Sequence, residues 1–377
     1  MVDGGELSGH PGLRSRPILS RPVWGPAASD VCRQPGQFVS QPCSIPARFS
    51  PFTPASLLPG PRAAMKRDDD AWAILLAGGD GVRLRSLTRS ITGDARPKQF
   101  CPLVDGETLL DRTRRRAELL VRPDRHVIVV TRDHQRFYAP FEGDLSPGRL
   151  VVQPANRGTA PGILYPVLRI EDLAGDPPVV IMPSDHDVVD EVGFARHVAA
   201  ALDLARALPD RVILLGMEPE APEAEYGWIE TFPTPLDAGG EPVFAVHRFW
   251  EKPMPALARA LFERGCIWNS FVMAGRVSAF RELLRRALPA LHEAFEPLRR
   301  RIGSRRESAL AQRVYRSIGD TSFSEQVLTR ATDRLAAMRV KNVGWCDLGT
   351  PARVAASLLR RGSRPAWPGA TGLASTA

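Results

Sequence analysis

Trp72–Leu84, WAILLAGGDGVRL, joins a short apolar run to a glycine-rich loop. The run from Ala71 to Ala77 has the length and composition of a buried β-strand, and the loop Gly78–Gly81 follows it directly. Glycines at such a place let the backbone adopt positive φ and bring bare N–H groups close to a ligand. Arg83 and, further along, Lys98 carry the charge that a polyphosphate requires. The stretch predicts a phosphate-binding loop, with a glycine-rich surface turn as the alternative.

Two familiar phosphate-binding loops do not fit this stretch. The Walker pattern Gly-x-x-x-x-Gly-Lys-Ser/Thr has no match in the chain. The dinucleotide fingerprint Gly-x-Gly-x-x-Gly would begin at Gly79, but its third glycine position is occupied by Leu84. The loop is therefore expected to serve another kind of phosphate chemistry.

Length and composition indicate a soluble α/β protein. The 377 residues are enough for one large domain or two smaller ones, and 44% of them are hydrophobic and 24% charged. No apolar run approaches the roughly 20 residues of a membrane span, so we predict no membrane partner. The cysteines are odd in number and form no CxxC pair, which favours a reducing, cytoplasmic compartment and no zinc site. They are Cys32, Cys43, Cys101, Cys266 and Cys346.

The net charge of +8 comes almost entirely from arginine, because the chain has only four lysines. Nucleic-acid binding requires clustered basic residues with aromatics between them. The densest run, Arg112–Arg116, lies on a predicted helix face, so we attribute the excess to composition and predict no nucleic-acid partner. Since lysine is scarce, Lys98 and Lys252, which lie inside motifs, become candidate functional residues.

The chain divides by composition. Residues 1–64 are rich in Pro, Arg, Ser and Gly, and we expect a disordered extension, with Met65 as the natural start. Residues 65–360 form the predicted folded domain, and the Gly- and Pro-rich residues 361–377 form a flexible tail. The sequence does not fix the oligomeric state, and a homodimer is retained as one alternative.

Within this domain, apolar runs alternate with helical patterns over residues 65–217. We predict strands at 73–77, 126–131, 150–153, 178–182 and 211–216, and helices at 107–121, 159–173 and 192–208. Continuous β-branched runs separated by helices indicate parallel strands covered on both faces. Ligands of such sheets bind at the carboxyl ends of the strands. Gly78, Gln153 and Asp185 all fall at such ends, from three different strands, and predict a shared site.

Residues 218–360 have a different pattern. We predict paired strands at 226–232 and 243–249, a helix at 254–264 and a strand at 267–274. Helices are expected at 276–300, 323–336 and 351–360, with short strand-like pieces at 339–343 and 345–348. No internal repeat is present.

Eight segments, taken in order, resemble the signature of the sugar-nucleotidyltransferases, specifically the mannose-1-phosphate guanylyltransferases. The resemblance covers about residues 72–358. It implies a Rossmann-like mixed, mostly parallel sheet flanked by helices, of the nucleotide-diphospho-sugar transferase type. The nucleotide-binding half would be 65–217 and the smaller α+β sugar-phosphate-binding half 218–360. The segments are Gly78–Leu84, Arg96–Phe100, Gln153–Pro161, Pro183–His186, Tyr226–Glu230, Phe249–Pro253, Trp268–Phe271 and Gly344–Gly349.

The resemblance implies a reaction between two small-molecule substrates, an NTP and a sugar 1-phosphate, with GTP and mannose 1-phosphate first. In-line attack on the α-phosphate would give an NDP-sugar and pyrophosphate. The catalytic residues would be Arg83, Lys98 and Asp185. Nucleotide binding would fall to Gly78, Gly79, Gly81, Gln153, Gly158 and Thr159, and sugar-phosphate binding to Gly227, Glu251, Lys252 and Asn269. Mg²⁺ would be the cofactor, held by Asp185 and Asp347.

Several alternatives stay open. Asp185 could be a helix N-cap, and Asp347 could cap backbone in a glycine-flanked turn. Gly158 stands where guanylyltransferases usually carry Asn, and Phe271 replaces a frequent Gly, which leaves base and sugar specificity open. Another NTP, or another hexose or heptose 1-phosphate, would keep the same reaction. A nucleotide-sugar sensor without turnover is the alternative from a different class.

Overall fold

A computed structural model of the chain describes residues 67–363 and residue 367. The expectations for residues 1–64, for a start at Met65 and for most of the tail 361–377 lie outside the described residues. Among the helices that the structure describes, none has both the length and the apolar character needed to cross a membrane.

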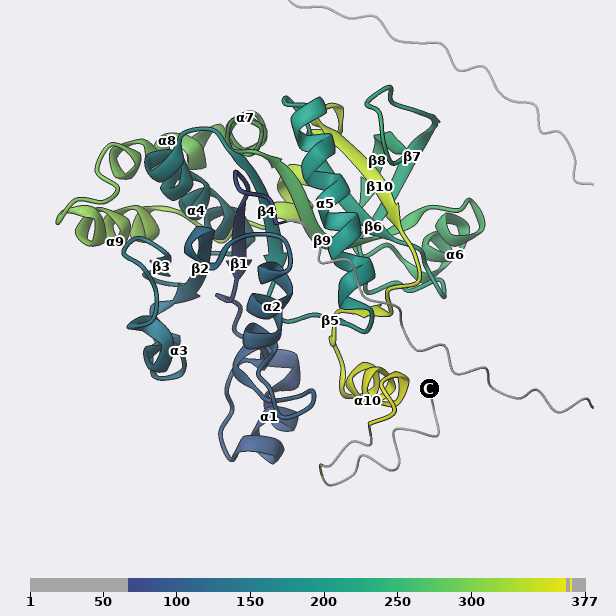
Figure 1. The fold of residues 1–377 in the computed structure, drawn as a ribbon, viewed down its shortest axis with the longest axis horizontal. Coiled ribbons are helices and arrows are strands. Elements are labelled where there is room, and N and C mark those ends of the chain that lie inside the picture. Colours follow the sequence, from purple (N-terminus) through teal and green to yellow (C-terminus); the bar gives the residue numbers. More distant parts are fainter. Residues whose placement is uncertain (1–66, 364–366, 368–377) are drawn as a thin grey trace, which may run out of the picture. The chain divides into compact units, whose positions relative to one another are not determined.

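The domain is built on a nine-stranded sheet with the order β3-β2-β1-β4-β9-β6-β10-β8-β7 (Figure 1). Strands β3, β2, β1 and β4 are parallel, and β9 runs antiparallel between β4 and β6. Strand β10 is parallel to β6, and β8 and β7 complete the sheet in antiparallel pairing. The mixed, mostly parallel sheet is confirmed. The strands are β1 (Trp72–Leu76), β2 (His126–Thr131), β3 (Leu150–Gln153), β4 (Pro178–Pro183), β6 (Val212–Met217), β7 (Trp228–Pro235), β8 (Val243–Trp250), β9 (Ile267–Arg276) and β10 (Leu335–Val340).

Helices cover both faces of the sheet and create two cores. Alternate residues of β1 show why: Ala73 and Leu75 belong to one core, and Trp72 and Ile74 to the other. The first core is closed by α2, α3 and α5, and the second by α4, α7, α8 and α9. The helices are α1 (Arg85–Thr92), α2 (Leu109–Glu118), α3 (Gln135–Glu142), α4 (Thr159–Ala174), α5 (Glu191–Ala207), α6 (Pro255–Glu263), α7 (Val277–Ala287), α8 (Pro289–Arg299), α9 (Glu307–Ser317) and α10 (Pro351–Arg360).

The helix expected at 323–336 is wrong. Ser324–Leu328 forms one π-helical turn and Thr332–Arg334 one 3₁₀ turn, and β10 starts directly afterwards at Leu335. The alanines of β10 favour a helix by local propensity. In the sheet, however, Ala336 and Ala337 face opposite cores, and two-sided burial overrides that propensity.

The expected helix at 276–300 is two helices, and α9 was not predicted at all. Helix α7 ends at Ala287, and α8 begins with Pro289 in its first turn, where the missing N–H of proline is tolerated. Helix α9 packs on α8 and turns Ala311, Val314 and Tyr315 into the second core. The polar residues of α9, among them Arg, Ser and Gln, interrupt its apolar residues, so the sequence shows no clear apolar face.

A small two-stranded sheet joins distant parts of the chain. Strand β5 (Asp187–Val188) follows β4, and it pairs antiparallel with β11 (Trp345–Cys346) through the partners Asp187 and Cys346. Asp185 lies just before β5, and Asp347 lies just after β11. Antiparallel pairing therefore brings these two aspartates, far apart in sequence, to the same end of one ribbon.

The arginine-rich face of α2 is buried rather than solvated. Arg112 and Arg116 are both buried and lie within 3.3 Å and 3.7 Å of Glu191 on α5. Arg112 also lies 3.9 Å from Asp187, which has no exposed side-chain surface. Because unpaired buried charges are costly, this network fixes α2 and α5 against β5.

Asp187 is the centre of this network. Its carboxylate accepts hydrogen bonds from the Arg361 guanidinium at 2.6 and 2.9 Å and from the Ser357 hydroxyl. Burial raises the pKa of Asp187, but the hydrogen bonds from Arg361 and Ser357 outweigh it, and the pKa lies below its ordinary value of 3.8. The carboxylate is therefore ionised at neutral pH and ties β5 to the end of α10.

We predict that Asp187→Asn lowers the free energy of unfolding by about 3 kcal/mol at neutral pH, because Arg361 and Arg112 lose a buried partner. The folded-state pKa of Asp187 is depressed, so its contribution is present above the unfolded-state pKa and is lost as pH falls through the folded-state value. Urea unfolding of both proteins at about pH 7 and about pH 3 measures this. A difference between them that persists undiminished at the acid end would contradict the role of the carboxylate charge.

Candidate active site

A cavity of about 360 Å³ opens at the carboxyl ends of β1, β3 and β4. Gly78, Gln153 and Asp185, the three residues predicted from strand ends, all line it. The structure thus brings these three residues, from three different strands, to one cavity. Its other lining residues are Leu76, Gly79, Val129, Asn156, Gly158, Thr159, Gly162, Pro183, His186 and Phe271.

Two glycines of the loop pack closely against their surroundings, and the backbone requires glycine at the second of them. A Cβ on Gly78 would lie 2.5 Å from Nε2 of Gln153, so any side chain there would displace that amide. Gly81 has φ of +58°, and a Cβ on it would lie 2.9 Å from the backbone N of Lys98. Gly79, by contrast, has open space where a Cβ would be.

Lys98 connects the loop to both carboxylate-bearing segments. Its Nζ donates to the backbone oxygen of Asp347 at 2.6 Å and lies 3.3 Å from Oδ2 of Asp185. A longer contact of 3.4 Å reaches the backbone oxygen of Leu348. Only 10% of the Lys98 side chain is exposed, so the ammonium is a fixed positive charge at the base of the site.

Gln99 holds the glycine loop in place, a role that was not predicted. Its Nε2 donates to the backbone oxygens of Ala77 at 2.9 Å and Gly79 at 2.7 Å. Gln99 was part of a quoted motif, but nothing in the motif's spacing shows that its amide bonds back to the loop. The short 3₁₀ turn Lys98–Phe100 therefore fixes the loop and supplies the cation together.

Asp185 presents an ionised carboxylate to the cavity. Burial raises its pKa, but the charge of Lys98 and then that of His186 lower it, and the net shift is downward. Nε2 of His186 lies 3.5 Å from Oδ1. Asp185 is not the N-cap of the following helix, since Asp190 caps α5 by accepting from the backbone N of Gly193.

Asp347 lies beside Asp185, but its carboxylate already has protein partners. Oδ1 accepts from the Tyr226 hydroxyl at 3.1 Å and from the backbone N of Gly349 at 2.9 Å. Arg353 on α10 lies 3.2 and 3.3 Å from the two carboxylate oxygens. Neither Arg353 nor Tyr226 was predicted: Tyr226 begins one of the signature segments and Arg353 lies outside them, and the sequence alone does not show that either contacts Asp347.

The donor set can be tested against a divalent cation. Carboxylate oxygens suit a hard ion such as Mg²⁺, which takes one or two of them and completes its shell with phosphates and waters. Asp185 fits, because a third of its side chain is exposed toward the cavity. Asp347 fits if it shares its oxygens with Arg353. Within residues 67–363, no group of three or more His, Cys, Asp or Glu side chains is arranged to hold a metal by protein ligands alone.

Arg83 lies at the rim of the site rather than at its base. Together with Gly81, Lys98, Asp185 and Gly349 it lines a second cavity of about 260 Å³. Its side chain is 60% exposed, and its guanidinium lies 3.7 Å from the Glu225 carboxylate. An exposed pair of this kind is weakly bound, so Arg83 is free to turn toward an anionic ligand.

Three of the predicted sugar-side residues are brought together. A Cβ on Gly227 would lie 3.1 Å from Oε2 of Glu251 and 3.3 Å from Cβ of Asn269. The backbone N of Asn269 donates to the Gly227 oxygen at 2.8 Å. Burial raises the pKa of Glu251, and the neighbouring Lys252 only partly offsets it. Lys252 itself is exposed, with Nζ 3.7 Å from Oε1 of Glu251.

The residues on the nucleotide side of the cavity differ in backbone conformation and in hydrogen bonding. Gly158 has φ of +83° and backbone atoms of Thr321 where a Cβ would stand, so no other residue fits there. This explains the departure from the usual Asn. Thr159 lines the cavity, and its hydroxyl accepts from the backbone N of Phe323 at 2.7 Å. Phe271 has φ of +60° and lines the cavity.

Trp228 and Trp268, which lie in two of the segments that carry the family resemblance, belong to the core. Trp228 has no exposed surface, and Trp268 is 8% exposed. They pack edge to face with ring centroids 6.0 Å apart, and Tyr226 packs on Trp268 at 4.9 Å. They form part of the core beneath β7 and β9, the strands next to the predicted sugar-phosphate-binding residues.

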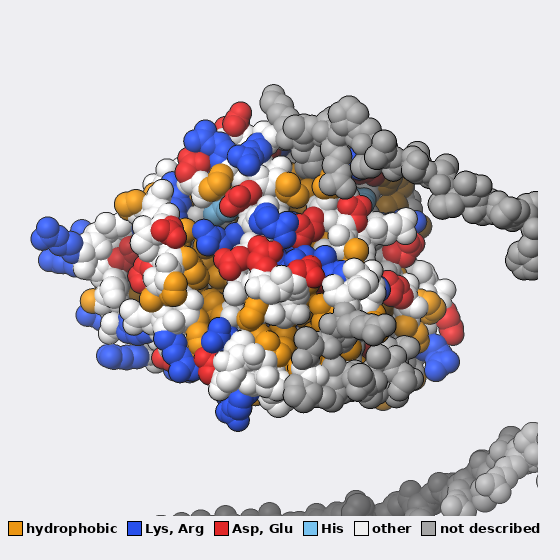
Figure 2. All heavy atoms as spheres, turned by 60° about the horizontal axis from the view of Figure 1, so that its bottom comes forward, with side chains coloured by type: hydrophobic (Ala, Val, Ile, Leu, Met, Phe, Trp, Pro, Cys, Tyr) orange, Lys and Arg blue, Asp and Glu red, His pale blue; other side chains and the backbone are white. Residues whose placement is uncertain are grey.

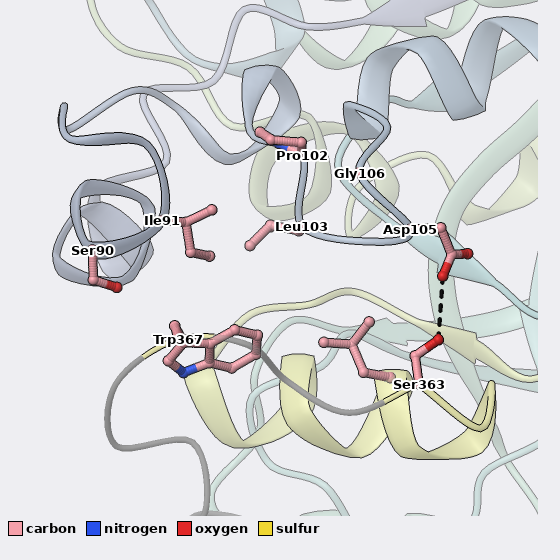
Figure 3. Close-up of a pocket in the computed structure, with 9 residues that line it drawn as sticks. Ser90, Ile91, Pro102, Leu103, Asp105, Gly106, Ser363 and Trp367 are labelled. Carbon is pink, nitrogen blue, oxygen red and sulfur yellow. Dashed lines mark hydrogen bonds between the residues drawn. The ribbon is translucent and has the colours of Figure 1, made fainter.

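A larger cavity, of about 460 Å³, lies elsewhere (Figure 3). It opens between α1 and the loop after it on one side and α10 on the other, and Ile91, Leu103 and Trp367 give it an apolar lining. The hydroxyl of Ser363 donates to Asp105 at its edge. None of the predicted site residues lines it, so its size alone does not mark it as the reaction site.

Charge is mixed on the surface that Figure 2 shows. Acidic and basic side chains of the described residues are interspersed over this face rather than gathered by sign. The arrangement agrees with the view that the arginine excess reflects composition.

Comparisons with known proteins agree with this geometry. The chain is 32% identical over 289 residues to the xanthan biosynthesis protein XanB of Xanthomonas campestris, a match that covers 74% of this chain and 58% of XanB. It is 26% identical over 295 residues to the mannose-1-phosphate guanylyltransferase ManC of Salmonella typhimurium, which covers 75% of this chain and 58% of ManC. The chain thus spans less than two thirds of these relatives.

A solved structure has a similar fold. The Thermus thermophilus protein described as mannose-1-phosphate geranyltransferase is 31% identical, with a TM-score of 0.66 over 77% of this chain and 79% of that one. The family model described as nucleotidyl transferase matches residues 72–357. That range contains the glycine loop, Lys98, both aspartates and the sugar-side residues. The chain therefore belongs to the nucleotidyl transferase family.

Proposed function

We propose that this protein transfers a nucleotidyl group from an NTP to a sugar 1-phosphate, giving an NDP-sugar and pyrophosphate. GTP and mannose 1-phosphate are the first candidates, because relatives such as ManC are named for that pair. One observation carries the proposal. The Lys98 ammonium, next to the glycine loop, contacts both the Asp185 carboxylate and the backbone at Asp347.

This reaction requires that the two substrates be positioned and that the negative charge of their phosphates be neutralised. The nucleophile is a phosphate oxygen of the sugar 1-phosphate, which is already ionised at neutral pH, so no general base is needed. This oxygen attacks the α-phosphorus of the NTP in line with the leaving pyrophosphate, forming one P–O bond as another breaks. Fixed positive charges and N–H dipoles around the α-phosphate then lower the barrier.

Lys98 and the residues of the glycine loop each have a proposed role in the reaction. Lys98 neutralises the charge that develops around the α-phosphate, from its fixed place at the base of the site. Arg83 exchanges Glu225 for the β- and γ-phosphates and holds the pyrophosphate as it leaves. The N–H groups of Gly79 and Gly81 add dipoles directed at the same oxygens.

Mg²⁺ is the proposed cofactor, with Asp185 and Asp347 as its protein ligands. When bound, the ion would neutralise phosphate charge near the α-phosphorus. Asp185 keeps its carboxylate ionised for this purpose through the charge of Lys98. Arg353 and Tyr226 orient the Asp347 carboxylate from the other side.

The sugar phosphate is proposed to bind at Gly227, Glu251 and Asn269, with Lys252 at the exposed edge. Glu251 can accept hydrogen bonds from sugar hydroxyls, and Gly227 allows Glu251 and Asn269 to pack together, since a Cβ there would lie 3.1 Å from Glu251 and 3.3 Å from Asn269. Gln153 and Gly158 would bind the base on the opposite side of the cavity. A cytoplasmic location and a homodimer stay predictions from the sequence.

A sensor that binds without turnover is the competing function. Such a protein would have lost the charged groups that act on the phosphates. Here Arg83, Lys98, Asp185 and Asp347 are all present, and Lys98 and Asp185 are already paired. Catalysis is therefore favoured over sensing.

The proposal predicts pyrophosphate release when the protein is mixed with an NTP, a sugar 1-phosphate and Mg²⁺. We expect the fastest release with GTP and mannose 1-phosphate in a panel of four NTPs and several hexose and heptose 1-phosphates. A faster rate with another pair would keep the reaction and change the substrates. Tight binding of NDP-sugars without release from any pair would favour the sensor instead.

Lys98→Ala is predicted to lower kcat by at least about a hundredfold, because one preorganised charge next to the reacting phosphate is lost. Asp185→Ala is expected to have an effect of similar size. The matched control is Lys341→Ala, since Lys341 is an exposed lysine paired with Glu218. Steady-state rates should be corrected for the folded fraction, measured by thermal unfolding. A Lys98→Ala enzyme with near-wild-type kcat would remove Lys98 from the site.

A further inference from the structure

A buried tyrosine hydroxyl contacts the proposed base-reading residue. Tyr315, on α9, is 1% exposed, and its hydroxyl lies 3.1 Å from Oε1 of Gln153. The only other acceptor near this hydroxyl among the described residues is the backbone oxygen of Pro161, at 3.5 Å. A hydroxyl donates one proton, and the shorter contact takes it. Tyr315 therefore donates to the carbonyl end of the Gln153 carboxamide.

This contact fixes which end of the amide faces the site. Because Oε1 is held by Tyr315 on the α9 side, Nε2 lies at the glycine loop, next to Gly78. Gly162, in the first turn of α4, allows the amide to pack there, since a Cβ on it would lie only 3.3 Å from Oε1. Among the described residues Nε2 has no hydrogen-bond acceptor, although Gln153 lines the cavity. The side-chain amide of Gln153 therefore presents its N–H donor to the cavity in one fixed orientation.

The position of Tyr315 is independent of any ligand. Its ring packs against Phe295 and Tyr165, with centroids 5.9 and 6.4 Å away, and its backbone oxygen accepts from Nε of Arg157. Burial raises the pKa of the Tyr315 hydroxyl well above its ordinary value, so the proton is retained for donation. The hydroxyl is held firmly enough to act on Gln153.

An amide donor distinguishes bases by the group opposite it. A carbonyl oxygen, as at position 6 of guanine or hypoxanthine, accepts from an N–H group, whereas the amino group of adenine is itself a donor. A free glutamine would rotate its amide to suit either base. We infer that Tyr315 is a specificity-determining residue, which prevents this rotation and makes the site select 6-oxopurine over 6-aminopurine nucleotides. The inference rests on the proposed function in taking the cavity as the nucleotide site and Gln153 as a residue that contacts the base.

The test compares ITP with ATP, because neither carries a 2-amino group and they differ at position 6 and in the N1 proton that goes with it. The ratio of kcat/KM for the two nucleotides is measured for the wild type and for Tyr315→Phe, together with the ratio of their Kd values by calorimetry. A ratio is insensitive to the folded fraction of each preparation. The matched control is Tyr165→Phe, which removes a neighbouring buried hydroxyl that donates to Glu307 and does not contact Gln153.

We expect the wild type to favour ITP by at least about tenfold, Tyr315→Phe to lose most of that preference, and Tyr165→Phe to keep it. An unchanged ratio in Tyr315→Phe, or a wild type that favours ATP, would overturn the inference. The Kd ratio separates this outcome from failure of the proposed function. A protein that releases no pyrophosphate but shows the expected Kd ratios would retain the role of Tyr315 and lose the reaction.

Discussion

One buried ammonium group holds the site together. Lys98 bonds to the backbone of Asp347, 249 residues away in the sequence, and pairs with the Asp185 carboxylate. A buried charge that loses its partners is costly, so these groups are held where they are. The β5–β11 ribbon gives the same two aspartates their common end, and Gln99 fixes the glycine loop beside them. The phosphate chemistry that we propose follows from this fixed arrangement.

Ion pairs outside the site hold the segments that carry its two aspartates. Asp187, two residues beyond Asp185, accepts from Arg361 and lies near Arg112, so the end of α10 and the face of α2 meet at β5. Arg353, one turn into α10, reaches back to the Asp347 carboxylate. Residues at both ends of α10 therefore contact the segments that form the site. Gln153, the residue that we propose binds the base, is held in the same way by the Tyr315 hydroxyl on α9.

The sequence was informative where local pattern and burial agree, and less so elsewhere. The parallel strands of the first half and the convergence of Gly78, Gln153 and Asp185 followed from continuous apolar runs and from the geometry of parallel sheets. The helix predicted at 323–336 overlaps the first two residues of strand β10, because two-sided burial decides the structure there and local propensity does not. Gln99, Arg353 and Tyr315 were missed as site residues, since their roles depend on contacts that only tertiary folding creates.

The central claim is that Lys98 and the glycine loop bind the phosphates of the nucleotide. A crystal structure with an NDP-sugar bound, such as GDP-mannose, tests this most directly. We expect a phosphate within hydrogen-bonding distance of Lys98 Nζ, with the base beside Gln153 and the sugar beside Glu251. A nucleotide bound away from Lys98, for example in the cavity lined by Ile91 and Trp367, would contradict it.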